Sequence, residues 1–540
     1  MADILRLPFI VHALLTASFA AVIAAASGYF LVARGLTFAG HALPNIGFAG
    51  AAGAVLLGIE PVFGLFAFTL GAGVVVGFVG KDIRERDVSI GVVMTFALGL
   101  GLLFLALYSG YAARVYGILF GNILGISAQA VRVTAVASGL ILAVIVFLYR
   151  PLLFSTFDPP AAEARGVPRV ARVHSPGGSC SDRHPACEEP ARRDPRLGRA
   201  GACVRLAGHI SCRRERQASR ELLHRDAFLP RLHPGAAPVA DGKGSVLMFS
   251  LLASDIFQNA LLGGTAAAVM ASLVGYFLVL RVQAFATEAF SDICFAGATG
   301  AALLGQSPLI GMIVFALLSA LSLGALGERA RGRNVEIGMV LSFALGLGVL
   351  FLSIYTRSSA SHANAGVSIL FGSILSVQPA DILRMLASGG AALVTLALIY
   401  RPLLFASIDP AAARARGVPL RMLSVVFLLV LALAAAACTF VVGVLLSSAL
   451  LIAPAAAAVR LTHRPLHSLL LSLAFGLGIT WAGLLVSFAG PWRHPPVGFS
   501  ISALAALVYA TATILGRNRR RRGSQRIDLD REVREKEGRL

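Results

Sequence analysis

Apolar runs of about 18 residues or more recur along most of this chain. Each run is long enough to cross the hydrocarbon core of a bilayer as an α-helix, since about 20 residues span about 30 Å. Charged residues make up only 14% of the sequence, and they lie mainly between and after the apolar runs. The sequence therefore predicts an all-α polytopic membrane protein whose outer surface is solvated mostly by lipid.

The sequence also repeats itself. Met1 aligns with Met248, and the offset of 247 residues becomes 251 after an insertion in the polar loop 355–365. The clearest matching pairs are TFALGLG (95–101) with SFALGLG (342–348), LFGNIL (119–124) with LFGSIL (370–375), and YRPLLF (149–154) with YRPLLF (400–405). A self-similarity of this length indicates two tandem copies of one permease-like helical bundle.

We expect about five membrane helices in copy 1 (1–168) and nine in copy 2 (248–516). The expected ranges are 8–33, 38–58, 61–79, 88–108 and 131–149 in copy 1, and 255–280, 285–305, 308–326, 335–355, 382–400, 420–440, 441–459, 466–489 and 497–515 in copy 2. The loops at Arg34, at 81–87 and from Arg150 onward carry the charges. The positive-inside rule therefore places these loops in the cytoplasm and the N-terminus outside.

The segment 169–247 between the copies has a different composition, with 14 arginines, five histidines and four of the six cysteines. We expect an irregular Arg/Pro/Cys-rich segment outside the membrane, which leaves copy 1 incomplete. A frameshift that fuses two adjacent permease genes would explain the change in composition, and a natural regulatory insert is the alternative. The residues 517–540 are expected to form a charged cytoplasmic tail.

A zinc module is a further interpretation of this segment. Its cysteines are Cys180, Cys187, Cys203 and Cys212. Structural zinc sites usually bring their ligands in closely spaced pairs such as C-x₂₋₄-C, and these cysteines are more widely spaced. Compositional bias is therefore the favoured explanation.

Two polar pairs interrupt the most similar part of the copies. His41 and Asn45 of copy 1 lie at the positions that Glu288 and Asp292 occupy in copy 2. A spacing of four residues places both members of a pair on one helix face. Polar groups are costly in hydrocarbon, and neighbouring carboxylates repel unless a cation or protons neutralise them. The pairs predict a cation path, whereas capping or packing of a helix end, which Pro44 would suit, is the structural alternative.

Two similar segments follow the repeated YRPLLF. DPPAAEARGVP begins at Asp158 and has its glycine at Gly166, while DPAAARARGVP begins at Asp409 and has its glycine at Gly417. Asp-Pro opens a helix and glycine closes one, so each segment predicts a short, well-capped helix between membrane helices. A capped helix on the cytoplasmic side is suited to docking a soluble partner.

The net charge of +20 does not indicate nucleic-acid binding, because no basic stretch is interleaved with aromatic residues. The arginines instead suit contact with anionic membrane lipids. The sequence Gly80-Lys81-Asp82 lacks the preceding glycine and the Ser or Thr of a phosphate-binding loop. We therefore expect no enzymatic activity in this chain, and ATP hydrolysis, if used, on a separate subunit.

The order of these motifs resembles the zinc/manganese/iron ABC transporter permease family. Copy 2 shows the pattern over about 248–516, including SALLIAPAAAA (448–458), and copy 1 shows it to about Pro168. The resemblance implies a permease subunit of an ATP-binding cassette importer for manganese, zinc or iron in the bacterial plasma membrane. It also implies three partners: a cytoplasmic ATPase, a periplasmic or lipid-anchored metal-binding protein, and a second permease subunit.

In that family an Asp and a His four residues apart on the second helix are implicated in passing the metal. Carried over, these positions are His41 and Asn45 in copy 1 and Glu288 and Asp292 in copy 2. Neither copy keeps the Asp/His pair, which leaves the identity of the metal open. Oxygen ligands suit Mn²⁺, whereas imidazole suits Zn²⁺ and Fe²⁺. The metal is expected to be cargo, with no permanently bound cofactor.

Two other functions remain open from the sequence. A parallel repeat with buried acids is also typical of an ion- or proton-coupled secondary transporter. A non-functional product of two fused permease genes would share the same sequence features. Neighbouring genes for an ATPase and a metal-binding lipoprotein would favour the importer over both alternatives.

Overall fold

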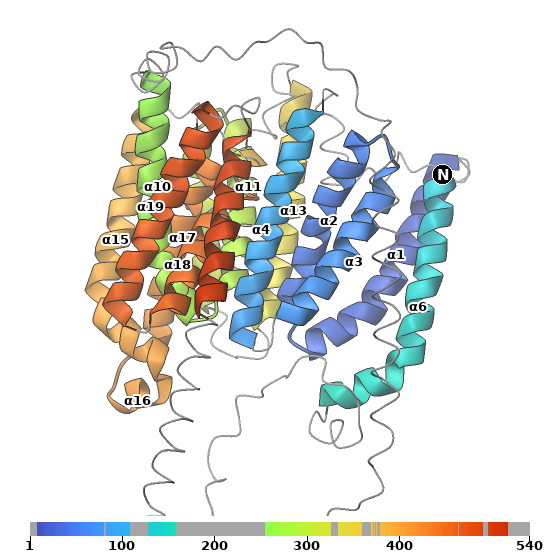
Figure 1. Cartoon of the computed structure of the whole chain (residues 1–540), viewed down its shortest axis with the longest axis horizontal. Coiled ribbons are helices and arrows are strands. Elements are labelled where there is room, and N and C mark those ends of the chain that lie inside the picture. The colour runs from blue at the N-terminus through green and yellow to red at the C-terminus, as the bar shows by residue number, and fades with distance from the viewer. Residues whose placement is uncertain are drawn as a thin grey trace, which may run out of the picture. The chain divides into compact units, whose positions relative to one another are not determined.

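The computed structural model describes residues 8–79, 83–108, 128–157, 254–325, 333–358, 369–370, 372, 374, 379–462, 464–489 and 495–516. All of these residues belong to one compact unit, Met1–His174 together with Leu247–Leu540. Regular structure within these ranges is helical throughout, and the long helices run side by side (Figure 1). This confirms the predicted all-α polytopic fold. The segment 169–247 and the tail 517–540 lie outside the described residues.

The helices follow the repeat. Copy 1 contributes α1 (Pro8–Ala33), α2 (Thr37–Leu56), α3 (Pro61–Val79), α4 (Ile83–Leu107) and α6 (Ala128–Phe157). The matching helices of copy 2 are α10 (Asp255–Leu280), α11 (Ala284–Leu303), α12 (Pro308–Ala325), α13 (Arg333–Ser358) and α15 (Pro379–Ile408). Copy 2 continues with α16 (Pro410–Ala415), α17 (Leu420–Val442), α18 (Ser447–Leu461), α19 (Pro465–Ala489) and a last helix, Val497–Gly516. Each expected membrane helix therefore has a counterpart among the described residues.

Ten helices in the described part of the chain are long and apolar enough to cross a membrane. These ten include neither α2 nor α11, the helices that carry the polar pairs. Polar side chains and small residues lower the mean hydropathy of both helices. The same residues that mark the candidate path therefore weaken the membrane signal of the helices that hold them.

The start of α18 differs from the expected one. The sequence predicts a helix from 441, but α17 continues to Val442 and α18 begins only at Ser447. Gly443 separates the two helices with a φ of +101°, a value that glycine adopts without steric strain. As a result α18 has only 15 residues, and its N-terminal end is buried within the bundle.

Two expected loops are helical instead. Arg150 was expected to begin a loop, yet α6 continues past it to Phe157, and Pro151 lies inside that helix. Figure 1 shows α6 turning sideways near its C-terminal end, as expected for a helix that contains proline. Arg86 and Asp87 were expected in the charged loop 81–87, but both are buried in the first turns of α4.

The same packing recurs in both copies. α2 packs against α3 and α4, and α11 packs in the same way against α12 and α13. A Cβ atom at Gly50 would meet the backbone of Gly64, and one at Gly297 would meet the backbone of Gly311. Only glycine permits such close approach of two membrane helices, so these positions hold each copy together.

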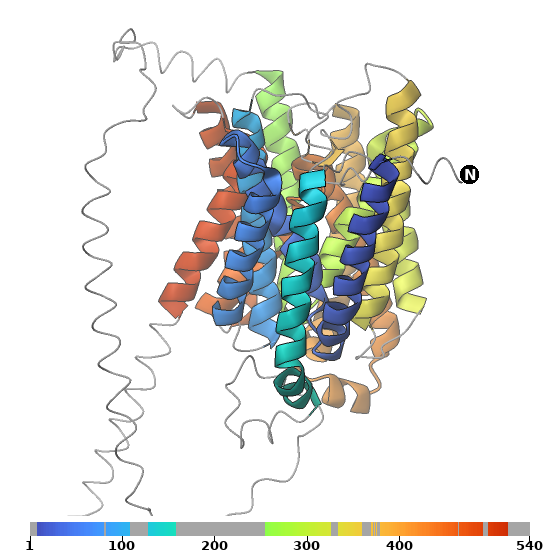
Figure 2. The ribbon, with the colours of Figure 1, turned by 90° about the vertical axis from the view of Figure 1, so that its right-hand side faces the viewer.

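The second half of copy 2 covers α10 and reaches copy 1. α10 packs against α17, α18 and α19, and α18 also packs against α4 of copy 1. Ser89 of α4 shares a 2.9 Å hydrogen bond with the Tyr509 hydroxyl of the last helix, which also accepts one of 2.9 Å from Arg460 of α18. By contrast α1 packs mainly against α6. Figure 1 shows this pair along one edge of the bundle, and the same pair faces the viewer in Figure 2.

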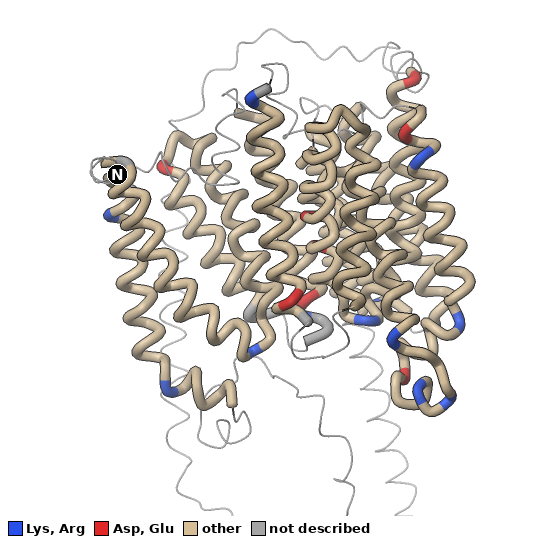
Figure 3. The backbone as a smooth tube through the Cα atoms, turned by 180° about the vertical axis from the view of Figure 1, so that it is seen from behind, with Lys and Arg blue, Asp and Glu red and all other residues tan. Residues whose placement is uncertain are grey.

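Charged positions gather at the two ends of the helices (Figure 3). Few acidic positions lie between the ends, and the buried acidic residues Glu288 and Asp292 belong to α11. This distribution is that of a bilayer protein, because charge near the middle of the hydrocarbon is costly. The buried acids Glu288 and Asp292 therefore mark the candidate functional site.

Candidate metal site

The polar pairs lie within helices rather than at their ends. His41 is the fifth residue of α2, and Pro44 stands in the interior of that helix. Glu288 and Asp292 likewise lie inside α11, all of whose residues from Ala284 to Ala301 are buried. The interpretation that Pro44 marks a first helical turn is therefore wrong.

The two copies bring their pairs together. His41 Nε2 lies 3.5 Å from Asp292 Oδ2. One potential ligand atom from each of His41, Glu288 and Asp292 lies within 4.8 Å of the other two. Ligand atoms that bind one metal at about 2.2 Å lie at most about 4.4 Å apart. A small inward shift would therefore let one imidazole and two carboxylates bind the same ion.

The carboxylates are enclosed. Glu288 is 0% exposed and Asp292 is 3% exposed, whereas the His41 side chain is 16% exposed. Within the described part of the chain, neither carboxylate oxygen of Glu288 has a hydrogen-bond partner. An unpaired buried charge costs several kcal/mol, and the adjacent carboxylate adds repulsion. A bound divalent cation would relieve both costs.

Asn45 supports the imidazole rather than joining the three-residue group. Its amide Nδ2 lies 3.3 Å from His41 Nε2 and 3.8 Å from the sulfur of Met94. This contact holds the imidazole ring in position beside α11. A metal ion bound at Nε2 would take the place of the Asn45 hydrogen, because both use the single lone pair of that nitrogen.

Phenylalanine rings cover one side of the imidazole. The ring of Phe285 lies 6.0 Å from the His41 ring and 5.5 Å from the Phe38 ring, measured between centroids. Phe38 and Phe285 occupy the same position in the two copies, and both are buried. The apolar cover lowers the local polarity and strengthens attraction between the carboxylates and a cation.

Sequence reasoning missed the hydroxyl groups beside α11. Ser447 of α18 donates a 2.6 Å hydrogen bond to Ser291, which lies between the two acids. Ser448 is also fully buried near Glu288. The signal available in the sequence was two adjacent serines at the start of an otherwise apolar run, SSALLIAPAAAA (447–458). Met94, whose sulfur contacts Asn45, could not be recognised in the sequence, because it is one apolar residue among many in α4.

The other expected site residues lie apart from this group. Asp409 caps α16, since its Oδ1 accepts a 2.9 Å hydrogen bond from the Ala412 amide, and Gly417 has a φ of +78°. The expected short capped helix is thus present in copy 2. Asp158 and Gly166 of the matching segment in copy 1 lie outside the described residues, as do the cysteines of the segment 169–247.

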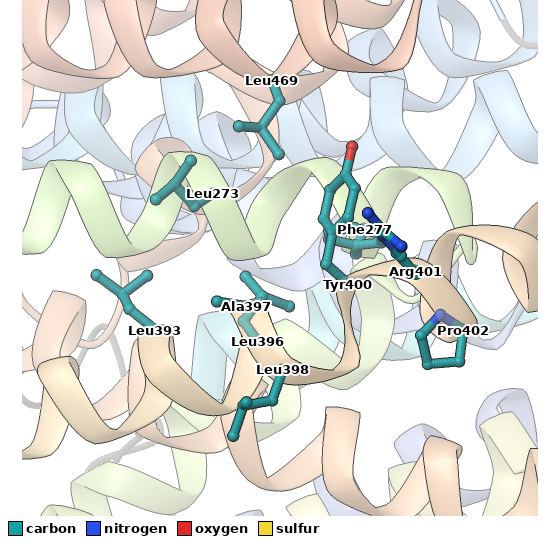
Figure 4. Close-up of a pocket in the computed structure, with 10 residues that line it drawn as sticks. All are labelled: Leu273, Phe277, Leu393, Leu396, Ala397, Leu398, Tyr400, Arg401, Pro402 and Leu469. Carbon is teal, nitrogen blue, oxygen red and sulfur yellow. The ribbon is translucent and has the colours of Figure 1, made fainter.

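An apolar groove of about 610 Å³ lies elsewhere, between α10, α15 and α19 (Figure 4). Its lining residues are Leu273, Phe277, Leu393, Leu396, Ala397, Leu398, Tyr400, Arg401, Pro402 and Leu469. Among the described residues, no carboxylate or imidazole lines it, and such a surface suits lipid chains rather than a metal ion. The group formed by His41, Glu288 and Asp292 therefore remains the candidate metal site.

The comparisons with known proteins cover both copies. The model of the family described as the ABC 3 transport family matches residues 6–173 and 253–516. The manganese transport system membrane protein MntC of Halalkalibacterium halodurans is 30% identical over 266 residues, which is 48% of this chain and 88% of that protein. The manganese import system permease protein ScaB of Streptococcus parasanguinis is 31% identical over 233 residues, 43% of this chain and 81% of that protein.

A solved structure is also similar. It is described as PsaBC from Streptococcus pneumoniae in complex with Fab and is 28% identical to this chain. The match covers 50% of this chain and 94% of that chain, with a TM-score of 0.44.

Proposed function

This chain belongs to the ABC 3 transport family, and from that premise we propose that it forms the translocation path of an ATP-driven importer for a divalent transition metal. It is a multi-pass protein of the bacterial plasma membrane and a transport subunit rather than an enzyme. Manganese is the first choice of substrate, because the relatives MntC and ScaB are named for manganese transport. Zinc and iron are the other candidates.

The observation that carries this proposal is the composite group at the contact between the two copies. Copy 1 supplies the nitrogen of His41, and copy 2 supplies the carboxylates of Glu288 and Asp292. Two carboxylates and one imidazole suit Mn²⁺, Fe²⁺ or Zn²⁺. A site shared between two packed bundles also opens when the bundles move apart, which transport requires.

The residues have distinct roles in this proposal. Glu288 and Asp292 attract the dehydrating cation and neutralise its charge, while His41 completes the ligand set from the opposite copy. Asn45 holds the imidazole ring in position beside the site. The rings of Phe38 and Phe285 exclude water from that side. Release follows when the copies separate and the ligands no longer meet.

The test replaces each acid by its neutral isostere. Glu288→Gln and Asp292→Asn should lower manganese accumulation at least about tenfold, because each removes a ligand charge while preserving shape. Accumulation is measured in host cells whose own copy of the gene has been deleted and replaced by the variant. Asp381→Asn is the control, since that carboxylate pairs with Arg384 at the start of α15. Unchanged accumulation in both site variants would refute the site.

A proton-coupled secondary transporter is the second candidate, favoured by the buried acid pair alone. The two functions differ in their energy source. Manganese uptake that stops on ATP depletion while the proton gradient is maintained supports the importer. Uptake that survives ATP depletion and stops with the gradient supports the secondary transporter instead.

We further propose that α16 docks the cytoplasmic ATPase. Its cap at Asp409 and its closing Gly417 make the short helix a rigid projection. Asp409→Ala with Gly417→Val should uncouple ATP hydrolysis from transport and reduce recovery of the ATPase with the purified chain. Ser254→Ala, which removes the cap of α10, is the control. Full recovery of the ATPase after deletion of 409–417 would count against docking there.

A periplasmic or lipid-anchored metal-binding protein is the proposed donor of the metal.

The domain division is proposed on the same basis. Copy 1 (1–168) is an incomplete permease domain, 169–247 is a linker of frameshift origin, 248–516 is a complete permease domain, and 517–540 is a cytoplasmic tail. The family match leaves 174–252 uncovered, which supports the proposed linker. Resequencing the locus tests the frameshift, and a single uninterrupted frame with no better-coding alternative would contradict it.

A further inference from the structure

Ser448 is a buried polar side chain beside the candidate site. Ser448 is 0% exposed and lies within interaction range of the Glu288 carboxyl group. The two groups interact with each other, but they do not meet hydrogen-bond geometry, and neither has another hydrogen-bond partner among the described residues. Burying a hydroxyl without a partner costs about 1–3 kcal/mol, so its placement beside an unsatisfied carboxylate requires a reason.

The neighbouring hydroxyls are satisfied, which singles out Ser448. Ser447 donates to Ser291 at 2.6 Å, and Ser291 donates to the Thr287 carbonyl oxygen at 3.1 Å. Thr287 in turn donates to the Gln283 carbonyl oxygen at 3.3 Å. The bond between Ser447 and Ser291 joins α18 to α11, and the other two are local bonds of α11. Ser448 takes part in none of the three.

The backbone holds Ser448 in place. The break at Gly443 starts α18 inside the bundle, where Ser448 is the second residue of the helix. The N-terminal end of a helix carries a partial positive charge that favours anions nearby. Because Ser447 is already bonded to α11, the first turn of α18 is fixed against the helix that carries Glu288 and Asp292.

We propose that Ser448 is a further oxygen ligand of the transported cation, acting together with Glu288. This inference rests on the proposed function and deepens it by naming a further ligand that distinguishes Mn²⁺ from Zn²⁺. With Ser448 the site has three side chains that bind through oxygen, all from copy 2, and one imidazole from copy 1. An oxygen-rich set of this kind favours Mn²⁺ over Zn²⁺.

The experiment changes the ligand atom at this position. Ser448→Ala removes the oxygen and Ser448→Cys replaces it with sulfur, and Mn²⁺ and Zn²⁺ binding to the purified full-length chain is measured at equilibrium. We expect Ser448→Ala to weaken Mn²⁺ binding about tenfold. We expect Ser448→Cys to shift the preference from Mn²⁺ toward Zn²⁺ by at least about tenfold, because thiolate prefers Zn²⁺. Competition of Zn²⁺ with manganese uptake should rise in parallel.

Ser272 provides the matched control. Its hydroxyl is also buried without a hydrogen-bond partner in the described residues, but it packs on α19 near Gly476 rather than beside a carboxylate. Ser272→Ala and Ser272→Cys should leave the ratio of Mn²⁺ to Zn²⁺ affinity unchanged. If Ser448→Ala fails to fold, the test compares Ser448→Thr with Ser448→Cys. The threonine keeps the ligand oxygen and should retain the preference for Mn²⁺, whereas the cysteine replaces that oxygen and should lose it.

The outcomes separate this inference from the proposed function. If Glu288→Gln abolishes Mn²⁺ binding while both Ser448 variants keep the parent affinity ratio, the role of Ser448 is overturned and the proposed function stands. If Glu288→Gln also leaves Mn²⁺ binding intact, the proposed function fails with it. An equal loss of Mn²⁺ and Zn²⁺ affinity in Ser448→Cys indicates a purely structural serine and likewise overturns the inference.

Discussion

The two copies have the same first helices but bury them differently. Tyr29 of α1 is 51% exposed, whereas Tyr276 at the matching position of α10 is 3% exposed. No described atom lies within 4 Å of a Cβ built on Gly28, while one built on Gly275 would meet the backbone of α18 at Leu451. The difference arises because α17, α18 and α19 cover α10. The described part of copy 1 holds no such helices to cover α1.

The difference in burial is reversed at the fourth helix of each copy, which is α4 in copy 1 and α13 in copy 2. Val92 of α4 is 5% exposed, and the matching Met339 of α13 is 63% exposed. Gly99 of α4 faces Ser502 of the last helix, whereas the described residues leave open space around the matching Gly346. Here copy 1 is the covered copy, because the second half of copy 2 packs against α4.

The proposed incompleteness of copy 1 accounts for both contrasts. Helices matching α17 through Val497–Gly516 would cover α1 and, by the symmetry of the repeat, α13 as well. A bare apolar face is destabilising in water, but lipid tails solvate it as well as leucine does. An incomplete copy is therefore tolerable in a membrane. The burial of a residue in this protein therefore depends on the helix that faces it rather than on its own position in the repeat.

The largest expected effect separates α10 from α1. Gly275→Leu should prevent α18 from approaching α10 and destabilise the protein by at least about 3 kcal/mol, since the obstructing atoms belong to the backbone. Gly28→Leu, at the matching position, should change stability little. The yield of monodisperse protein in detergent and its thermal unfolding measure both. Equal loss in the two variants would show that α1 is covered in the protein.

The next largest effect concerns the contact between the copies. Gly99→Leu should push the last helix away from α4 and cost about 1–3 kcal/mol, while Gly346→Leu should be close to neutral. Because the contact helps to keep copy 1 and copy 2 in register, Gly99→Leu should also reduce manganese accumulation. Thermal unfolding and uptake are measured side by side. A loss at Gly346 as large as that at Gly99 would mean that α13 also has a helical partner.

A third prediction compares the copies at the site. His41→Ala should lower Mn²⁺ affinity about tenfold, because it removes a ligand. Asn45→Ala should lower it less, since Asn45 only orients the imidazole. Both effects should be smaller than that of Glu288→Gln, and equilibrium binding to the purified chain measures all three. An effect of Asn45→Ala equal to that of Glu288→Gln would assign Asn45 a direct role.

The smallest expected effect tests the hydrogen bonds between the copies. Tyr509→Phe removes a hydroxyl that bonds Ser89 of copy 1 and Arg460 of copy 2, and should cost about 1 kcal/mol in total. Tyr29→Phe, at an exposed position of α1, is the control and should leave the unfolding temperature unchanged. If the two variants unfold at the same temperature, the Tyr509 bonds contribute nothing measurable.

Local pattern was enough to locate the elements. The 3.6-residue period and the length of each apolar run place α1, α3, α10 and α12 almost residue for residue. The period does not report where a break falls inside a continuous apolar run, so the start of α18 at Ser447 was missed. The helical extension of α6 past Arg150 was missed for a related reason, because a charged residue near a membrane surface is compatible with loop and helix alike.

The sequence by itself determined the fold class, the repeat, and the placement of His41 with Asn45 and of Glu288 with Asp292 on single helix faces. Only the tertiary structure decided that His41 meets Asp292 across the copies and that Ser448 stands beside Glu288. Helical periodicity relates residues within a few turns of one another. Contacts between residues about 150 to 250 positions apart depend on how whole helices pack, which the spacing of residues along one helix does not encode.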